Sequence, residues 1–456
     1  MHETIGADEE GNTVSKYRLV LEIRRDRQRL TIEQASSFVE RPDGTPVSMR
    51  SEQSLGAEPV VLEASFKENG IELVTRSGGR EVRDTRPPIE GRWLPPAAAA
   101  EYVRQRLEAG AEEIVVRTVD PAGGLVPVTI TRSNITRTEV EVIGKRIPAF
   151  RTSVRHSSLP GIESTEYLDA SGRAVRSSIN LGPMSLEIIA SERELALAEL
   201  DPPELMQRTF VRPDRLIERP RGATSASFVL SVPEGALPEL PVSGAQTVEP
   251  LEDGRVRVHV RAGRTTPAPD AADPVYLQAS TMLDLTDPEL IALHRRATRN
   301  LGDDPKARAE ALRRFVYRYI TDKSLGVGFA TASEVARTRH GDCTEHSALL
   351  AALLRLDGVP SRVVSGLIYA DSFAGSDDIF GFHMWVQAAV EIDGERRWLD
   401  LDPALPERSI FDATHIALAT STLRDDEPTN SMVALVPLMG RLEIVVERVE
   451  HDARGR

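Results

Sequence analysis

The feature that most constrains the fold is a long apolar run that begins directly after a polar turn. Residues 333–360 read SEVARTRHGDCTEHSALLAALLRLDGVP, and the run follows Cys343, the single cysteine among 456 residues. From Ala348 to Leu356 the run has almost no polar face, and a helix that is apolar nearly all round is a buried helix. Gly358 and Pro360 then provide the usual stop signals. The sequence therefore predicts a buried helix with a thiol on its first turn.

The position of this thiol has two interpretations. Cys343 would face the unpaired N–H groups and the positive end of the helix dipole, and both favour the thiolate, which is the nucleophile. The alternative is that Cys343 is a small buried hydrophobic side chain, which is the commonest role of a lone cysteine. The choice between the two depends on whether the rest of the chain supplies catalytic partners.

The composition bounds the class of protein. A hydrophobic content of 40% and a charged content of 28% are ordinary for a globular protein, and the length predicts two or three domains. The net charge of −14 argues against a nucleic-acid partner, and no apolar run approaches the ~18 residues that a membrane span needs. The polar, acidic start predicts neither a signal peptide nor a transit peptide. The compartment is therefore open: periplasmic or extracellular if a leader was removed, and cytoplasmic otherwise.

Short strand-like segments and later helix-like segments predict an α+β chain. The early segments alternate apolar and polar residues, which indicates antiparallel sheets with one face in water. Near the C-terminus we expect strands at 432–438 and 442–450, and a surface loop at 371–381. The expected parts are a disordered N-terminus at 1–15, a β-rich antiparallel domain at 16–200, a linker at 201–222, a small β unit at 223–264, a second linker at 265–285, and the domain with the buried helix at 286–456.

A histidine and an aspartate on a predicted hairpin are candidate partners of Cys343. A thiol nucleophile needs a base and usually an acid that orients the base. Asp393-Gly394 is a strong two-residue turn signal, and with that turn His383 and Asp402 share one face of the hairpin as diagonal neighbours. Diagonal neighbours lie roughly 7–8 Å apart, within reach of a hydrogen bond between their side chains. Asp400 shares the face but lies too far along the strand, so the geometry favours Asp402.

These residues together resemble the core of the bacterial transglutaminase-like superfamily. The pattern of that family is Gly-x-Cys at a helix start, then Arg-x-x-Gly-[Ile/Val]-Pro-x-Arg, then His-x-Trp-Val, and then a Trp strand that ends in Asp-Pro. The resemblance covers roughly residues 286–420 and does not reach the N-terminal β region. The matching residues are Gly341-Asp342-Cys343; Arg355, Gly358, Val359, Pro360 and Arg362; His383-Met384-Trp385-Val386; and Trp398 with Asp402-Pro403.

The resemblance implies a fold and a chemistry. The fold is a papain-like α+β core in which the cysteine helix packs on an antiparallel sheet. Cys343 would be the nucleophile, His383 the general base and acid, and Asp402 the residue that orients His383. The thiolate attacks an amide carbonyl to give a thioester, which water hydrolyses or an amine captures. We expect a peptide or protein substrate, hydrolysis rather than cross-linking, and no cofactor.

Two other interpretations stay open. His340, Cys343 and His346 have the ligand types of a zinc site, although they lie in one short stretch and leave His383 and Asp402 without a role. The second alternative is a non-catalytic protein that binds a peptide or a protein through the N-terminal β domain.

Overall fold

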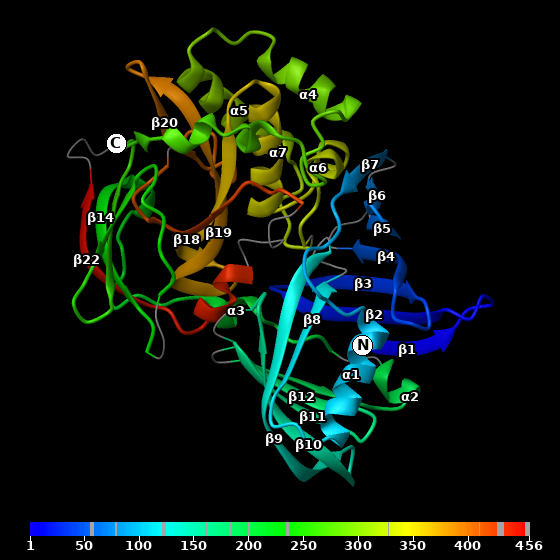
Figure 1. Cartoon of the computed structure of the whole chain (residues 1–456). Helices are drawn as coiled ribbons and strands as arrows, with labels where there is room; N and C mark the ends of the chain where they lie inside the picture. Colours follow the sequence, from blue (N-terminus) through cyan, green and yellow to red (C-terminus); the bar gives the residue numbers. More distant parts are fainter. Residues whose placement is uncertain are drawn as a thin grey trace. The chain divides into compact units, whose positions relative to one another are not determined.

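The computed structural model describes residues 1–54, 59–77, 80–120, 125–159, 162–181, 184–198, 201–233, 237–326, 328–409, 411–425 and 433–451. The chain is α+β and mostly strand, and its N-terminal region is antiparallel, as the sequence predicts (Figure 1). The chain divides into two compact units: Met1–Glu22 with Thr31–Pro202, and Ile23–Leu30 with Pro203–Arg456. In the part of the chain that the structure describes, no helix is long and apolar enough to cross a membrane.

The first unit contains two sheets whose strands follow the order of the chain. The seven-stranded sheet runs from β1 to β7, and the six-stranded sheet runs β13-β12-β11-β10-β9-β8. Consecutive strands pair, as short connections in a meander require. The strands are β1 (His2–Ala7), β2 (Thr13–Arg25), β3 (Gln28–Glu40), β4 (Pro46–Ser54), β5 (Val60–Lys67), β6 (Gly70–Ser77), β7 (Arg80–Arg86), β8 (Ile114–Asp120), β9 (Val126–Val142), β10 (Lys145–His156), β11 (Glu163–Leu168), β12 (Ala174–Leu181) and β13 (Met184–Ile189).

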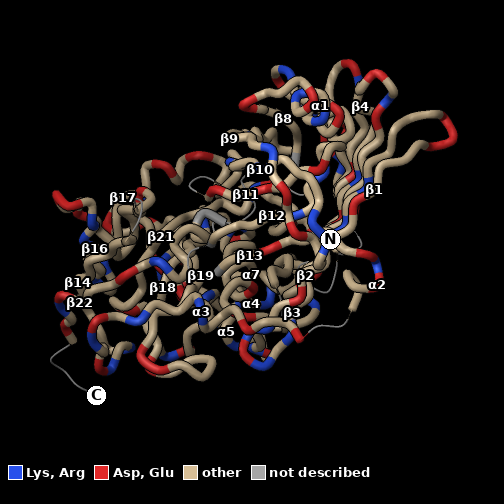
Figure 2. The backbone as a smooth tube through the Cα atoms, turned by 90° about the horizontal axis from the view of Figure 1, so that it is seen from below, with Lys and Arg blue, Asp and Glu red and all other residues tan. Residues whose placement is uncertain are grey.

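The seven-stranded sheet has a charged face and an apolar face. Glu63 of β5 lies 2.5 Å from Arg50 of β4 and 2.8 Å from Arg76 of β6, and Arg76 also lies 2.9 Å from Glu81 of β7. Exposed pairs of this kind stabilise by only ~0.2–1 kcal/mol each, so their main effect is to keep this face polar. Figure 2 shows acidic and basic residues interspersed along the strands. The apolar core includes Phe38, Met49, Ala64, Ile71 and Leu73.

Helix α1 (Pro96–Glu108) connects the two sheets of the first unit. The carboxylate of Glu40 accepts the N–H groups of Ala97 and Ala98 at 2.8 and 3.1 Å, which satisfies donors that a helix start leaves unpaired. Val103 and Leu107 bury the inner face of the helix against β8. The short helix α2 (Arg193–Ala196) follows the last strand.

The second unit contains a four-stranded sheet, β15-β16-β14-β22, and a five-stranded sheet, β17-β20-β19-β18-β21. Helix α7 packs on β18 and β19 and is contacted by α4, α5 and α6 (Figure 1). The elements are α3 (Met206–Thr209), η1 (Pro220–Gly222), β14 (Ala223–Ser231), β15 (Gln246–Pro250), β16 (Val256–Arg261), β17 (Thr266–Pro267), η2 (Pro269–Ala272), η3 (Pro274–Leu277), α4 (Pro288–Thr298), α5 (Pro305–Tyr319), α6 (Ala332–Thr338), α7 (Cys343–Leu356), β18 (Ser361–Phe373), β19 (Ser376–Ile392), β20 (Glu395–Leu401), β21 (His415–Ser421), η4 (Val433–Leu438) and β22 (Glu443–His451).

Three segments adopt a structure that the sequence did not predict. Residues 1–15, expected to be disordered, contain β1 and the start of β2, because ladder pairing joins His2–Ala7 to the next strand. The strand expected at 432–438 is the 3₁₀ helix η4, and Pro437 within it could not donate to a ladder; residue 432 lies outside the described residues. Residues 371–381 form the end of β18 and the start of β19 rather than a loop.

Residues outside 286–456 also contribute to the second unit. Strand β14, from the expected small β unit at 223–264, pairs with the C-terminal strand β22. In the linker expected at 201–222, Val211 forms a bridge with Phe380 of β19. In the linker expected at 265–285, Thr266 pairs with Trp398 of β20. These long-range pairings leave no local sequence signal.

Candidate active site

Helix α7 begins at Cys343, and its start is held by a reciprocal pair of hydrogen bonds. The Oδ1 atom of Asp342 accepts the N–H of Thr344 at 3.0 Å, and the Oε2 atom of Glu345 accepts the N–H of Asp342 at 2.9 Å, which is a capping box. The Oε1 atom of Glu345 also accepts the N–H of Ala330 at 2.9 Å, which ties the helix start to the preceding loop. Cys343 is thus the first helical residue, and it is half-buried.

Gly341 allows this helix start to pack closely. Its φ of +148° is strained for a residue with a side chain, and a Cβ atom placed there would lie 2.2 Å from the Cβ of Glu345. Because Glu345 is fully buried, its side chain has no room to move away. The glycine of the Gly-x-Cys pattern is therefore required by packing at the position two residues before the thiol.

The hairpin β19–β20 has the predicted register. Ile392 pairs with Glu395, and both turn residues have positive φ, 52° at Asp393 and 80° at Gly394, as a two-residue type I′ turn requires. The register derived from the Asp-Gly signal is therefore confirmed. This register places His383 near the C-terminal end of β20, which Asp402 follows.

The structure brings His383 and Asp402 into direct contact. The Nε2 atom of His383 lies 2.8 Å from the Oδ2 atom of Asp402, and the Oδ1 atom of Asp402 accepts the N–H of Ala404 at 2.8 Å. Asp402 is buried, whereas the His383 side chain is 11% exposed. Because Nε2 faces the carboxylate, Nδ1 is the ring nitrogen that remains to face another group.

The Cys343 thiol lies beside the strand that carries His383. A backbone hydrogen bond joins the sulfur to Met384, the residue after His383. Met384 and Cys343 also belong to the apolar cluster between α7 and β19. Alternate apolar residues of β19 belong to this cluster: Met384, Val386, Ala388 and Val390.

Asp400 has a different role from Asp402. It is buried and accepts the indole N–H of Trp385, the amide of Gln387 and the backbone N–H of Ala245 at 2.7–2.9 Å. It lies opposite Gln387 in the ladder, and so farther along the strand from His383, as predicted. Its partners are structural groups, so it fixes β20 and the loop at Ala245 rather than His383.

His415, which sequence reasoning missed, is a second histidine in contact with Asp402. The Nε2 atom of His415, the first residue of β21, lies 3.1 Å from the same Oδ2 atom that faces His383. Its Nδ1 atom lies 3.0 Å from the carbonyl oxygen and 3.4 Å from the Oδ1 atom of Asp412. Pairing of β21 with β18 brings His415 to this position. The polar residues of 412–415, between apolar neighbours, were the available signal.

The charges in this cluster stabilise one another. Burial alone would raise the pKa of Asp402, but His383 and His415 hold it well below its ordinary value. Burial alone would lower the pKa of His415, but Asp412 and Asp402 raise it to about 9. The two histidines therefore favour the charged form of Asp402, and the two aspartates favour the charged form of His415.

The environment of the thiol differs from the sequence expectation. Burial raises the pKa of Cys343 well above its ordinary value, and the carboxylates of Asp342 and Glu345 act in the same direction. The Met384 backbone and Arg25 act in the opposite direction. The helix start alone favoured a thiolate, but burial and two acidic neighbours outweigh it, so the resting thiol is protonated.

Arg25 is the last residue of β2, and its segment Ile23–Leu30 groups with the second unit although the rest of β2 belongs to the first. Its Nη2 atom lies 2.7 Å from the Oδ2 atom of Asp342, in a largely buried ion pair. The ion pair partly compensates the negative charge of Asp342 next to the thiol. It also anchors the residue that caps α7.

The zinc alternative at His340, Cys343 and His346 is not supported. The Nε2 atom of His340 contacts the hydroxyl of Ser324, and the Nδ1 atom of His346 lies 2.6 Å from the carbonyl of Asp342. Burial lowers the pKa of His346 to about 4, so its ring is neutral, and its buried Nε2 atom has no hydrogen-bond partner among the described residues. Geometry argues against zinc, because the ligand atoms of the three residues do not form a close group in the described part of the chain. Among the described residues, the three-residue group with ligand atoms within 4.8 Å of one another is instead His383, Asp402 and His415, whose nitrogens are engaged with Asp402.

The two arginines of the matched pattern are structural. Arg355 donates to the carbonyl oxygens of Ser361 and Thr422 at 2.9 and 2.6 Å, which joins the end of α7 to β18. The guanidinium of Arg362 lies 4.1 Å from the ring centroid of Trp398, a cation–π contact. These contacts hold the layers of the second unit together.

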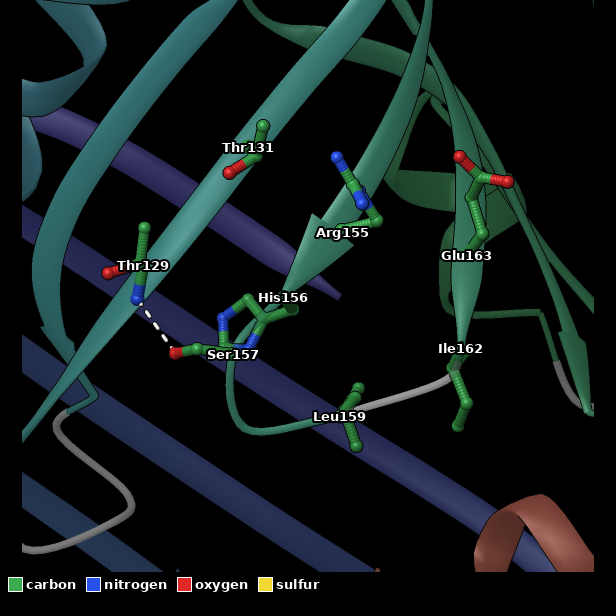
Figure 3. A pocket seen from close by; sticks show the side chains of 8 residues that line it. All are labelled: Thr129, Thr131, Arg155, His156, Ser157, Leu159, Ile162 and Glu163. Atoms are coloured by element: carbon green, nitrogen blue, oxygen red, sulfur yellow. Dashed lines mark hydrogen bonds between the residues drawn. The ribbon is translucent and has the colours of Figure 1, made fainter. Parts of the chain in front are cut away.

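A separate hollow lies on the six-stranded sheet of the first unit. Figure 3 shows its lining side chains, which come from β9, the end of β10, the start of β11 and the described residues between β10 and β11. The cavity measures about 560 Å³, and the Ser157 hydroxyl in it accepts the N–H of Thr129 at 2.9 Å. Arg155 and Glu163 bring opposite charges to its rim, so its chemistry favours no one class of ligand.

A comparison with known families identifies the segment that contains the thiol. Residues 292–403 match the model of the transglutaminase-like superfamily. The predicted resemblance is therefore confirmed over this segment, which includes Cys343, His383 and Asp402. His415 lies outside it.

Individual relatives overlap the chain only in part. An uncharacterized protein of Mycobacterium tuberculosis is 31% identical over 146 residues, which are 29% of this chain and 46% of that protein. The chain thus spans about half the length of the curated relatives it matches. A candidate cysteine protease from Cytophaga hutchinsonii (14% identity, TM-score 0.31) covers 51% of this chain and 87% of its own. A β-barrel-like protein with a domain of unknown function from Brucella abortus has 14% sequence identity and a TM-score of 0.32. The match covers 41% of this chain and 84% of that protein. TM-scores of this size add no argument about the site.

Proposed function

Since residues 292–403 form a transglutaminase-like segment, we propose that the second unit is a cysteine-dependent enzyme with a papain-like α+β core, and that it hydrolyses an amide or peptide bond. The observation that carries the proposal is the His383–Asp402 contact of 2.8 Å on the strand beside Cys343. A base oriented by a carboxylate next to a thiol at a helix start is the arrangement that nucleophilic thiol catalysis needs.

The first step forms a thioester. His383 takes the thiol proton on Nδ1 while the Cys343 sulfur attacks the amide carbonyl, because Nε2 is held by Asp402. The C–N bond then breaks, and the imidazolium gives the proton to the leaving amine. General-base transfer of this kind suits a thiol that rests protonated.

The helix start contributes to the stabilisation of the tetrahedral intermediate. The N–H of the first helical residue has no acceptor within its own helix, so the Cys343 N–H is available to the oxyanion. The dipole of the 14-residue helix α7 acts in the same direction.

The second step releases the acyl group. His383 takes a proton from water, the hydroxide attacks the thioester carbonyl, and the C–S bond breaks with return of the proton to sulfur. A primary amine in place of water would give a new amide, which is the transferase outcome. Hydrolysis of a peptide or protein substrate is the outcome that the family resemblance favours.

The test follows the covalent intermediate directly. The full chain is incubated with a defined mixture of peptides, with and without methylamine, and both intact protein and peptides are weighed by mass spectrometry. We expect an acyl adduct on Cys343, a carboxylic acid product in water, and an N-methylamide only if transfer competes.

The control is Cys343→Ala, which removes the nucleophile and leaves a small side chain at the helix start. Peptide cleavage that persists in this variant would overturn the proposal. Cleavage that requires Cys343 but continues in a variant without His383 would overturn the assignment of the base.

A further inference from the structure

His415 is enclosed by aromatic rings and lies out of reach of solvent. Its side chain is 0% exposed, the ring of Phe411 stacks on it with a centroid distance of 4.1 Å, and the indole of Trp385 meets it edge-on at 5.3 Å. A charged group in such a place persists only where its charge and its hydrogen bonds are compensated. The contacts of its two ring nitrogens therefore decide whether the ring is charged.

Both ring nitrogens of His415 face oxygen atoms that can only accept. Nδ1 lies 3.0 Å from the carbonyl oxygen of Asp412, and Nε2 lies 3.1 Å from the Oδ2 atom of Asp402. A neutral imidazole donates from one nitrogen only, so it would set a lone pair against one of these oxygens. Only the imidazolium satisfies both contacts.

The charges around His415 favour the same state. Asp402 and Asp412 contact the ring directly and are each only 1% exposed at the side chain. Arg221 balances Asp412 from its far side, with Nη1 2.7 Å from Oδ2. The titratable and charged groups that face or surround the ring are Asp402, Asp412, Asp400, His383 and Arg221.

We infer that His415 is a positioning residue, a buried imidazolium that fixes the carboxylate of Asp402 and directs its Oδ2 atom at His383. Asp402 then receives three donors: the N–H of Ala404 on Oδ1, and His415 and His383 on Oδ2. The inference rests on the proposed function for its catalytic meaning. His415 acts through Asp402, and its other nitrogen is taken by Asp412.

The arrangement gives His415 a consequence that depends on pH. When the ring loses a proton at alkaline pH, one of its nitrogens sets a lone pair against an oxygen, and the positive charge beside Asp402 is lost. The ring then holds the carboxylate of Asp402 less firmly. The orientation of the base should therefore weaken at the alkaline end of the pH range.

The protonation state is testable without turnover. Histidine-selective ¹⁵N labelling of the full chain gives signals for nine histidines, and the signal lost in His415→Gln identifies His415. We expect imidazolium shifts for both nitrogens of His415 at neutral pH, and conversion to the neutral ring only near about pH 9. A His415 ring that is neutral at pH ~7 would overturn the inference even if the enzyme is active.

The positioning role is tested by acylation with p-nitrophenyl acetate, which passes its acetyl group to sulfur and releases p-nitrophenolate. The background release of p-nitrophenolate, measured with Cys343→Ala, is subtracted from each rate. In His415→Phe, which removes donor and charge, we expect acylation at pH ~7.5 to fall about 10–100-fold. In His415→Gln, whose amide can donate to Asp402, we expect a smaller loss and no alkaline decline in the pH range where wild type declines. Equal losses in both variants, or unchanged rates, would overturn the inference.

Folding is controlled separately. The matched control is His259→Gln, at an exposed histidine of β16 in the same unit, which should behave as wild type. If the His415 variants do not fold, Asp412→Asn removes one acidic partner and keeps the backbone carbonyl. We then expect the NMR titration of His415 to move to lower pH, and an unmoved titration would contradict the inference.

Discussion

The Oδ2 atom of Asp402 lies 2.8 Å from the Nε2 atom of His383, although 19 positions separate the two residues in the chain. The two-residue turn at Asp393-Gly394 fixes the register of the hairpin, and Asp402 follows the last paired residue of β20. The contact engages Nε2, so Nδ1 is the ring nitrogen that takes the thiol proton in the proposed mechanism.

Asp402→Asn should abolish most of the activity without unfolding the unit. An amide in place of the carboxylate removes the charge that stabilises the imidazolium and favours the wrong ring tautomer of His383. We expect the rate of acyl-enzyme formation to fall about 10³–10⁴-fold. The measurement is acyl-enzyme formation with p-nitrophenyl acetate in single turnover, beside a thermal unfolding curve.

Asp400→Asn is the matched control for this change. Asp400 is equally buried and two residues away, but its partners are Trp385, Gln387 and Ala245. We expect it to lower the unfolding temperature and to change the rate per folded molecule much less than Asp402→Asn. A larger loss of rate in the Asp400 variant than in the Asp402 variant would show that Asp400, and not Asp402, orients His383.

Cys343 should react slowly with iodoacetamide at neutral pH. Burial, Asp342 and Glu345 raise the pKa of the thiol, so the thiolate fraction is smaller than that of an unperturbed cysteine at every pH below its folded value. The rate should therefore rise with pH into the alkaline range. Because the chain has one cysteine, the intact mass reports alkylation of this site alone. Rapid labelling near pH ~6 that depends on His383 would instead reveal a thiolate–imidazolium pair.

Much of the core of the site could be predicted from the sequence because its determinants are local. The helix start at Cys343 follows from a polar turn before an apolar run, and the contact of His383 with Asp402 follows from one turn signal and the two-residue period of a strand. The same reasoning separated Asp402 from Asp400. Each of these steps uses residues that are close in sequence or are joined by a single hairpin.

The parts that could not be predicted depend on long-range pairing or on burial. His415 reaches Asp402 because β21 pairs with β18, and the sequence carries no mark of that pairing. Strand β14 pairs with β22 from the far end of the chain, so a segment that looked like a separate unit belongs to a larger one. The protonated thiol of Cys343 results from the acidic and apolar groups around it, which the helix dipole alone does not reveal.

Gly341→Ala should impair the site through packing. A Cβ at this position meets the buried side chain of Glu345 at 2.2 Å and adopts a strained φ of +148°. We expect a destabilisation of about 1–3 kcal/mol and a fall in acylation rate, because Glu345 supports the residues before Cys343. Gly358→Ala is the control, since φ there is also positive, at 77°, but a Cβ meets nothing within 4 Å. Equal effects of the two substitutions on acylation would contradict the packing argument.

Removal of metal ions should leave the activity unchanged. The ligand atoms of His383, Asp402 and His415 lie within 4.8 Å of one another, but hydrogen bonds to Asp402 engage both histidines. The proposed chemistry passes protons and an acyl group and requires no Lewis acid. We expect the same peptide cleavage after dialysis against EDTA, with added Zn²⁺ as a separate arm. Activity that disappears with EDTA and returns with a metal would contradict the thiol mechanism as written.

The stability of the second unit should fall as the pH rises from about 6.5 to about 9. The pKa of His415 is raised from 6.5 to about 9 in the folded protein, so its stabilising contribution is complete below the unfolded value and is lost as pH rises through the folded value. The loss should reach at most about 3 kcal/mol. Urea unfolding followed by tryptophan fluorescence measures it, since Trp385 lies against the ring of His415. In His415→Gln the curve should be flatter over this range, because the contribution of His415 is removed and that of Glu345, whose pKa burial raises to about 8, remains. A wild-type free energy of unfolding that stays constant across this range would mean that the buried imidazolium carries no net stabilisation.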